Sequence, residues 1–322
     1  MYDVITIGSA TQDVYLLSKA FRITRDRRSP TGKAESFAFG SKTEVENILL
    51  EVGGGATNTA VTFAHLGLRT ACVCKVGQDA AGDEVIRALR RYKVDAKFVI
   101  RDADDHTALS TIFLSPSGER TVLVYRGASA DFTERMVPWP QLRSRWFYVT
   151  SLGGNLPFLR RALAHARRTH ASIAVNPGKA ELAQRPTALR VLRGADVVLL
   201  NTEEAQLLFR AKGRALQKQV SAWRKGIVVV TDGERGAWTV TPHSAWQLHI
   251  KPVKAMDTTG AGDAFGSGFV GALAKRPGDI GYALRFAAIN AASEVQVIGA
   301  KNGLLTHHLP HRTWFKLTAL HL

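Results

Sequence analysis

The segment DTTGAGD, residues 257–263, combines carboxylates, hydroxyls and small residues directly before a long apolar run. Gly260, Ala261 and Gly262 have minimal side chains, so their backbone N–H groups can converge on an anion at a helix N-terminus. The helix dipole adds roughly half a positive charge there. Asp263, in the first turn beside such an anion, can accept a proton from an attacking hydroxyl. The segment therefore predicts phosphoryl transfer to an alcohol, with Asp263 as general base and the three small residues as the anion hole.

A second glycine pattern, G-x-G-x-x-G, runs from Gly266 to Gly271. As a dinucleotide-binding fingerprint it would need a strand immediately before it and a turn at its glycines. Here it lies inside the apolar helical run, so its small residues predict close packing of that helix against its neighbours. The sequence contains no P-loop pattern G-x-x-x-x-G-K-[ST], so the phosphates would be held without one.

The elements that would position these residues alternate along the chain. Short apolar strands end in Gly, Asn, Ser or Asp, and alanine-rich helical segments separate them. This alternation predicts an α/β fold with a mostly parallel sheet covered by helices on both faces. Ligands of such folds collect at the carboxyl ends of the strands. The expected strands are YDVITIG, RTACVCKVG, SRWFYVTS, ASIAVNPG, ADVVLLN and GIVVVTDG.

Two β-rich stretches interrupt this rhythm. Residues 14–50 contain mixed and alternating runs without a good helix, and residues 106–126 read as a β-hairpin that turns at Pro116-Ser117-Gly118. We expect the two stretches to form one small sheet, a lid over the site. The predicted division is an α/β nucleotide- and substrate-binding core of residues 1–13, 51–105 and 127–322, with a lid of residues 14–50 and 106–126.

Composition excludes several classes of protein. With 45% hydrophobic and 22% charged residues, the 322-residue chain is an ordinary globular one, and no apolar run approaches the length of a membrane span. The N-terminus lacks the features of a signal peptide, which leads us to expect a cytoplasmic protein. The net charge of +16 is spread over amphipathic helices, so we expect no nucleic-acid partner. Cys72 and Cys74 have no second Cys/His pair at zinc spacing and read as small strand residues in a reducing compartment.

Four motifs, in order, resemble those of the ribokinase-like, or PfkB, carbohydrate kinases. EVGGGATNTAVTFAHLG is similar to the first signature of the family, and DTTGAGDAFGSGF is similar to the second. Between them, LNTEEA looks like the N-x-x-E motif and VVTDGERGA like the nucleotide-loop pattern. The resemblance implies a three-layer α/β/α core with a β-sheet lid, ATP as the donor, Mg²⁺, and phosphorylation of a sugar-like alcohol.

The resemblance also implies roles for individual residues. Thr11 stands where relatives often have an asparagine, which alters hydroxyl recognition. K⁺ is a candidate for the monovalent cation held behind the anion hole in many relatives. By position in the motifs, the acceptor would contact Asp13, Gly54, Asn58 and Arg126; the nucleotide would contact Asn201, Thr231, Gly233 and Gly236; Glu204 would act on Mg²⁺ through water; and Asp257 and Thr259 would hold the monovalent cation.

Alternatives remain open for the acceptor and for the class of function. The leading prediction is an ATP-dependent kinase for a small-molecule sugar or nucleoside. The run from Tyr125 to Ala130 looks somewhat like 2-keto-3-deoxygluconate kinases, which makes a sugar acid a second candidate acceptor. A chain of another class would be an inactive kinase fold used as a basic binding module. The lid is also a candidate surface for a homodimer.

Overall fold

A nine-stranded sheet forms the centre of the molecule. The computed structural model describes residues 1–322 apart from 30–31, 115–119, 224, 307–314 and 321–322. The strand order in this part of the chain is β17-β16-β15-β14-β13-β12-β11-β1-β6. The strands from β14 to β6 are parallel, and β15, β16 and β17 continue the sheet as an antiparallel edge. Their bounds are β1 (Tyr2–Ile7), β6 (Thr70–Val73), β11 (Ser144–Val149), β12 (Ser172–Val175), β13 (Val197–Asn201), β14 (Ile227–Thr231), β15 (Ala237–Val240), β16 (Ala245–Ile250) and β17 (Phe315–Ala319).

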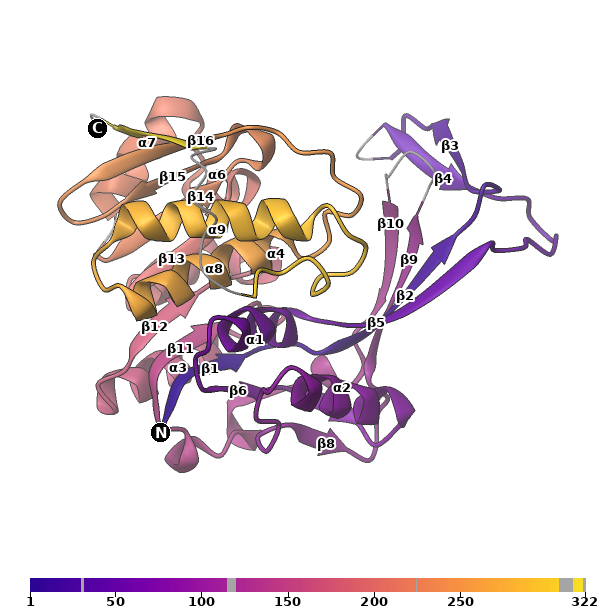
Figure 1. The fold of residues 1–322 in the computed structure, drawn as a ribbon, viewed down its shortest axis with the longest axis horizontal. Coiled ribbons are helices and arrows are strands. Elements are labelled where there is room, and N and C mark those ends of the chain that lie inside the picture. The colour runs from indigo at the N-terminus through magenta and orange to yellow at the C-terminus, as the bar shows by residue number, and fades with distance from the viewer. Residues whose placement is uncertain (30–31, 115–119, 224, 307–314, 321–322) are drawn as a thin grey trace.

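Helices cover both faces of this sheet, which confirms the predicted fold class (Figure 1). Successive side chains of a strand point to opposite faces. On β13, Val198 packs in one buried cluster and Leu199 in the other. The first cluster contains residues of α3 (Leu156–Arg168), α4 (Lys179–Ala183), α5 (Arg185–Leu192), α6 (Thr202–Phe209) and α7 (Gly213–Trp223). The second contains residues of α8 (Ala261–Lys275) and α9 (Ile280–Glu294), and α8 packs against both α9 and α1 (Gly55–His65).

The glycine pattern inside α8 does serve close packing, as predicted. A Cβ on Gly268 would lie 3.1 Å from the Cα of Ala287 on α9, and one on Gly271 would lie 2.4 Å from Leu66 beyond α1. The two glycines therefore allow α8 to pack closely between α9 and α1. A third buried cluster, under α1 and α2 (Ala80–Arg91), contains the free side chains of Cys72 and Cys74.

A smaller four-stranded sheet projects from one side of the core (Figure 1). Its strand order is β10-β9-β2-β5, and the antiparallel pair β9–β10 is the expected hairpin, whose turn lies outside the described residues. The bounds of its strands are β2 (Thr11–Leu17), β5 (Asn47–Gly53), β9 (Ala108–Leu114) and β10 (Arg120–Tyr125). A separate pair, β3 (Arg22–Arg25) and β4 (Lys33–Ser36), lies at its tip. Another pair, β7 (Lys75–Gly77) and β8 (Ile100–Asp102), lies beside α2. The four-stranded sheet is called the small sheet below.

The edge strands of the small sheet expose large apolar side chains. Ile48 and Leu50 on β5 and Leu123 and Val124 on β10 are each more than half exposed. Such a surface is typical of an interaction site, and the homodimer expected from the sequence stays a prediction. None of the helices in the described part of the chain combines the length and apolar character that a membrane crossing requires.

Candidate active site

The two signature segments meet at one hydrogen bond. Helix α8 begins at Ala261, with Gly260 at the N-cap in a left-handed conformation (φ +94°), and Asp263 lies in its first turn. Asn58, in the first signature segment, lies on α1, and its Nδ2 donates to Asp263 Oδ2 at 2.9 Å. Residues 205 positions apart in the sequence are thus joined at the helix terminus where the sequence predicts the base. The strained start of the helix uses glycine because a residue with a Cβ rarely adopts this conformation.

Opposing effects act on the pKa of Asp263. Burial raises the pKa of this carboxyl, and the nearby charge of Asp13 raises it further. The hydrogen bond from Asn58 and the positive charge of Lys301 act in the other direction and lower it. A carboxylate whose pKa is raised toward the working pH is a better proton acceptor than an ordinary surface aspartate. The hydrogen bond from Asn58 and the charge of Lys301 thus favour the ionised form of this carboxyl against the effect of burial.

Two adjoining cavities surround this helix terminus. One, of about 210 Å³, is lined by Asp263, Glu204 and polar groups at the ends of β12 and β13. The other, of about 250 Å³, lies between the turn after β14 and the small side chains of α9. Thr231 and Gly262 line both. Of the residues expected to bind the nucleotide, Asn201 lines the first cavity, Gly233 and Gly236 line the second, and Thr231 lines both.

Asn201 and Glu204 form a reciprocal cap at the start of α6. Asn201 Oδ1 accepts from the Glu204 N–H at 2.8 Å, and Glu204 Oε2 accepts from the Asn201 N–H at 2.9 Å. This capping box explains the N-x-x-E spacing by itself. Burial raises the pKa of Glu204, whose carboxylate also lines the smaller cavity. The pair therefore stabilises the N-terminus of α6 at the edge of the candidate site.

Among the residues expected at the acceptor, three gather near Asp263 and one does not. Asp13 lies on β2, 5% exposed, and accepts a hydrogen bond from Thr11 Oγ1 at 2.8 Å. Gly54 is the N-cap of α1, where a Cβ would lie 2.6 Å from the Cα of Ala10, so only glycine allows this close approach. Arg126 follows β10 and is exposed.

The loop before α8 and the end of α9 contain buried oxygen atoms without partners among the described residues. Asp257 is fully buried, and its carboxylate accepts from the N–H groups of Thr259 at 2.9 Å and Gly299 at 3.1 Å. Thr259 Oγ1 and both carboxylate oxygens of Glu294 are buried without a hydrogen-bond partner among the described residues. Carboxylate and hydroxyl oxygens are the donors that hard cations prefer. The donor set fits the monovalent cation that the sequence leads us to expect there.

Arg120 connects the small sheet to this loop. It is the first residue of β10; its Nε lies 4.0 Å from Asp257 Oδ1 and its Nη1 donates to Thr258 Oγ1. No sequence signal singled out Arg120, because an arginine beside an expected turn is usually a surface residue. In the described part of the chain, Arg120 contacts this loop from the small sheet, whereas Arg126, the arginine expected at the acceptor, follows β10 and is exposed.

Two further charged residues near Asp263 have no local sequence signal. Lys301, in the turn after α9, is 4% exposed, and Glu294, at the end of α9, is fully buried. Burial and the negative charges of Asp257 and Asp263 raise the pKa of Glu294 to about 9. Since no described residue donates a hydrogen bond to its carboxylate, burying ionised Glu294 destabilises the folded protein.

Replacing Glu294 with glutamine should stabilise the protein increasingly as the pH rises. A carboxyl with a raised pKa stabilises the fold below its unfolded pKa, and this contribution is lost as the pH rises from 4.5 toward about 9. Glutamine does not titrate, so we expect a gain of about 1–3 kcal/mol at pH 8 and little gain at pH 4.5. Urea unfolding in tetramethylammonium buffers, which lack small cations, measures the difference. The exposed Glu203→Gln is the control, and a gain independent of pH would contradict the assignment.

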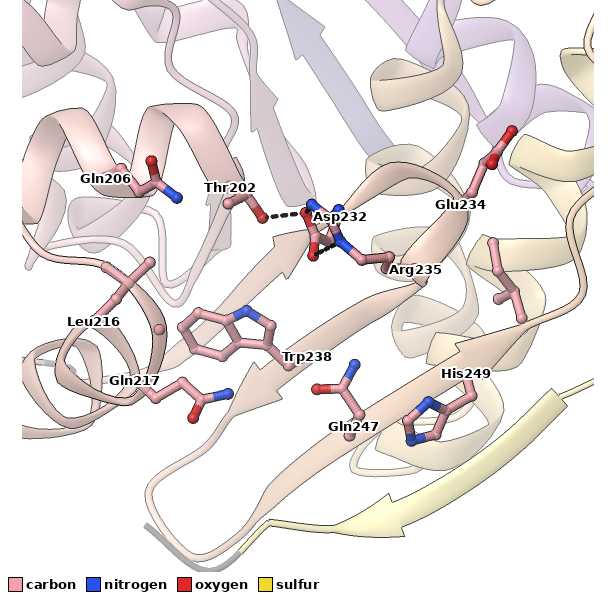
Figure 2. Close-up of a pocket in the computed structure, with 12 residues that line it drawn as sticks. Thr202, Gln206, Leu216, Gln217, Asp232, Glu234, Arg235, Trp238, Gln247 and His249 are labelled. Carbon is pink, nitrogen blue, oxygen red and sulfur yellow. Dashed lines mark hydrogen bonds and ion pairs between the residues drawn. The ribbon is translucent and has the colours of Figure 1, made fainter.

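A larger cavity lies beside α6 and α7, on the opposite face of the central sheet from α8 and Asp263. Figure 2 shows this space of about 610 Å³ between α6, α7 and the edge strands, with Trp238 as one wall. Two of its charged side chains already pair with each other, because Arg235 Nε donates to Asp232 Oδ2 at 2.7 Å. Thr202 Oγ1 also donates to Asp232 Oδ1 at 2.8 Å. Asp263 does not line it. Size alone therefore does not identify the site.

Comparison with known proteins gives the family. The model of the pfkB family of carbohydrate kinases matches residues 3–307. The chain is 26% identical over 307 residues to a ribokinase of Staphylococcus aureus, covering 92% of this chain and 95% of the relative. It is 31% identical over 228 residues to fructokinase-2 of Zea mays, covering 66% and 68%. A ribokinase structure from Thermotoga maritima superposes with a TM-score of 0.75 at 20% identity, over 94% of this chain and 96% of that one.

A nucleoside kinase of Burkholderia thailandensis in complex with inosine has the same fold, with a TM-score of 0.73 at 17% identity over 94% of both chains. The family match over residues 3–307 includes both signature segments that meet at Asp263. The chain belongs to the pfkB family of carbohydrate kinases and is a phosphotransferase with an alcohol group as acceptor.

Proposed function

We propose that this protein transfers the γ-phosphoryl group of ATP to a hydroxyl of a sugar or nucleoside, with Asp263 as general base and the amides of residues 260–262 as the anion hole. The observation that carries the proposal is the bond from Asn58 Nδ2 to Asp263 Oδ2 at the N-terminus of α8. It joins the residue expected at the acceptor to the residue expected to take its proton. The kinase family implies ATP as donor.

In this mechanism the chain mainly orients groups and stabilises charge. Asn58 fixes one carboxylate oxygen of Asp263, which orients the group toward an acceptor hydroxyl. Asp263 accepts the hydroxyl proton as the oxygen attacks. The N–H groups at the start of α8, together with the helix dipole, stabilise negative charge on the transferring phosphoryl group. Asp13, buried nearby, would accept hydrogen bonds from other hydroxyls of the same acceptor.

The two adjoining cavities support a nucleotide that spans them. The cavity against α9 is lined by small apolar side chains such as Ala288, Ala292 and Val295, which suit a nucleobase. The other cavity is lined by polar groups and the helix terminus, which suit phosphates. Thr231 and Gly262 line both, so one extended ligand can contact both ends. ATP would lie over the turn after β14, with its phosphates directed toward the start of α8.

Metal ions would be held at two places by residues of this chain. Glu204 would hold Mg²⁺ through water, since Mg²⁺ keeps much of its hydration shell. When bound, Mg²⁺ neutralises charge on the phosphate oxygens. Asp257 and Thr259, beside the unpartnered oxygens of Glu294, would hold a monovalent cation such as K⁺ behind the anion hole. That cation would fix the loop from which the helix starts.

A coupled ADP-release screen tests the proposed function. The panel contains pentoses, hexoses, nucleosides and sugar acids, each with ATP and Mg²⁺. Turnover with a sugar or nucleoside that depends on Asp263 is the expected result. The named relatives are ribokinases, fructokinases and a nucleoside kinase, which favours the neutral acceptors; Arg126, on which the sugar-acid alternative depends, is exposed. No turnover with any member of the panel would favour a binding module.

The small sheet is proposed to act as a lid that closes on the acceptor. Closure excludes water that would otherwise hydrolyse ATP. Support comes from Arg120, which already reaches the loop at Asp257 and Thr258 from β10. We expect acceptor binding to slow hydrogen exchange in β2, β5, β9 and β10, with β13 in the core as the internal control. Equal exchange of these strands with and without acceptor would show that closure is not coupled to binding.

A further inference from the structure

Lys301 is buried next to the proposed base, and its ammonium group donates hydrogen bonds to two oxygen atoms of the protein. The side chain enters from the turn after α9 and is 4% exposed. Its Nζ donates to Asn58 Oδ1 on α1 and to the backbone oxygen of Val52 on β5. A lysine is almost never fully buried without such partners. Lys301 therefore links the turn after α9 to α1 and β5, close to Asp263.

The chemistry of the three side chains fixes the orientation of the asparagine. An ammonium group can only donate hydrogen bonds, and an ionised carboxylate can only accept them. Between Lys301 and Asp263, the Asn58 amide must therefore present its oxygen to the lysine and its NH₂ to the aspartate. The contacts agree with this requirement: Oδ1 accepts from Lys301 Nζ, and Nδ2 donates to Asp263 Oδ2 at 2.9 Å. Without the lysine, the Asn58 oxygen would lose this donor, and within this chain of contacts only the carboxylate of Asp263 would hold the amide in its orientation.

The charges around Lys301 are mostly negative. The groups that face it are Asp13 on β2, Asp263 on α8, Glu51 on β5 and the thiol of Cys72 on β6. Burial lowers the pKa of Lys301 to about 8, against the opposite effect of these neighbours. The positive charge of Lys301 lowers the pKa of Asp263. The lysine thus acts on the base both through Asn58 and through space.

We propose that Lys301 is a positioning residue for phosphoryl transfer, which holds the Asn58 amide so that its NH₂ stays on Asp263 and which favours the ionised form of this base. The inference rests on the proposed function, in which Asp263 is the general base. A merely structural lysine would stabilise the fold through Val52 and leave the titration of Asp263 unchanged. The pH dependence of turnover therefore separates the two roles.

The test compares Lys301→Met and Lys301→Gln with the wild-type protein. Methionine keeps the length of the side chain but removes the charge and the donors, while glutamine keeps a donor for Asn58. For both we expect the acid limb of the kcat/KM profile to move up by about one pH unit, as expected when a nearby opposite charge is lost. We expect kcat at neutral pH to fall about tenfold or more for methionine and less for glutamine, with KM for ATP little changed.

The control is Lys75→Met. Lys75 is equally buried, but its ammonium pairs with Asp102 and Asp131, each at 2.5 Å, rather than with the proposed base. It should lower stability without moving the acid limb. Folded Lys301 variants with a wild-type acid limb would overturn the inference.

If neither Lys301 variant folds, the wild-type protein decides the question. The side-chain amide protons of Asn58 should exchange with solvent more slowly than those of the exposed Asn47, measured by ¹⁵N NMR. Exchange as fast as at Asn47 would contradict a held amide. Asp263→Asn, assayed in parallel, separates failure of the proposed function from failure of the role of Lys301. If that variant turns over normally, the proposed function fails; if it is inactive and the Lys301 variants keep the wild-type acid limb, only the role of Lys301 fails.

Discussion

Replacing Asp263 with asparagine should lower kcat by about 10²–10⁴-fold, because general-base assistance typically contributes that much. In free-energy terms this is roughly 3–5 kcal/mol of barrier. Asparagine preserves the shape of the side chain but cannot accept the hydroxyl proton. Asp263 lines only the smaller of the two proposed ATP cavities, and asparagine fills the same space, so KM for ATP should change little. Burial raises the pKa of Asp263, so wild-type kcat/KM should fall as the pH drops through a value above that of an ordinary aspartate.

Steady-state kinetics with the acceptor found in the screen measures this effect. Asp257→Asn is the matched comparison, since it also removes a buried carboxylate from the same loop but leaves the proposed base intact. It should change the response of the enzyme to K⁺ instead, and its loss of kcat should be smaller at saturating K⁺. Turnover by Asp263→Asn near the wild-type rate would contradict the mechanism.

The sequence predicted the elements that carry the second signature. Gly260 caps α8 and Asp263 lies in its first turn, because local properties decide both: glycine tolerates the left-handed cap and small apolar residues favour the following helix. The continuous apolar strands likewise predicted the parallel part of the central sheet. The antiparallel edge formed by β15, β16 and β17 was not predicted. Its strands AWTV, AWQLHI and FKLTA carry mixed polar and apolar residues, and β17 joins β16 across more than 60 residues of chain.

The charged groups around the base could not be predicted from local pattern. Lys301 lies in the segment GAKNG, Arg120 is the first residue of β10, and Glu294 is the last residue of α9. Each position is usually exposed, and the groups that surround each of the three side chains come from distant segments. Asn58 is 243 residues from Lys301, and Asp257 is 137 residues from Arg120 (257 − 120). Such pairs are set by the tertiary fold, so only the structure brings them together at the site.

Replacing Gly260 with alanine should destabilise the protein and impair turnover, whereas Gly262→Ala should affect mainly the nucleotide. Gly260 has φ +94°, and a Cβ there would lie 2.5 Å from the Cβ of Ala300 and 3.1 Å from Glu294 Oε1. The left-handed conformation costs an alanine about 1–2 kcal/mol, and the displaced neighbours add overpacking of about 1–3 kcal/mol.

Gly262 offers the matched control, because it is exposed and a Cβ there would meet no atom within 4 Å. Alanine is favoured over glycine inside a helix by about 1 kcal/mol, so Gly262→Ala should be as stable as wild type or slightly more so. Its methyl group would enter the space shared by both cavities, so KM for ATP should rise several-fold. Urea unfolding and initial rates at varied ATP separate the two outcomes. If Gly260→Ala were as stable as wild type and kept its kcat, the conformation at the start of α8 would not be required for the anion hole.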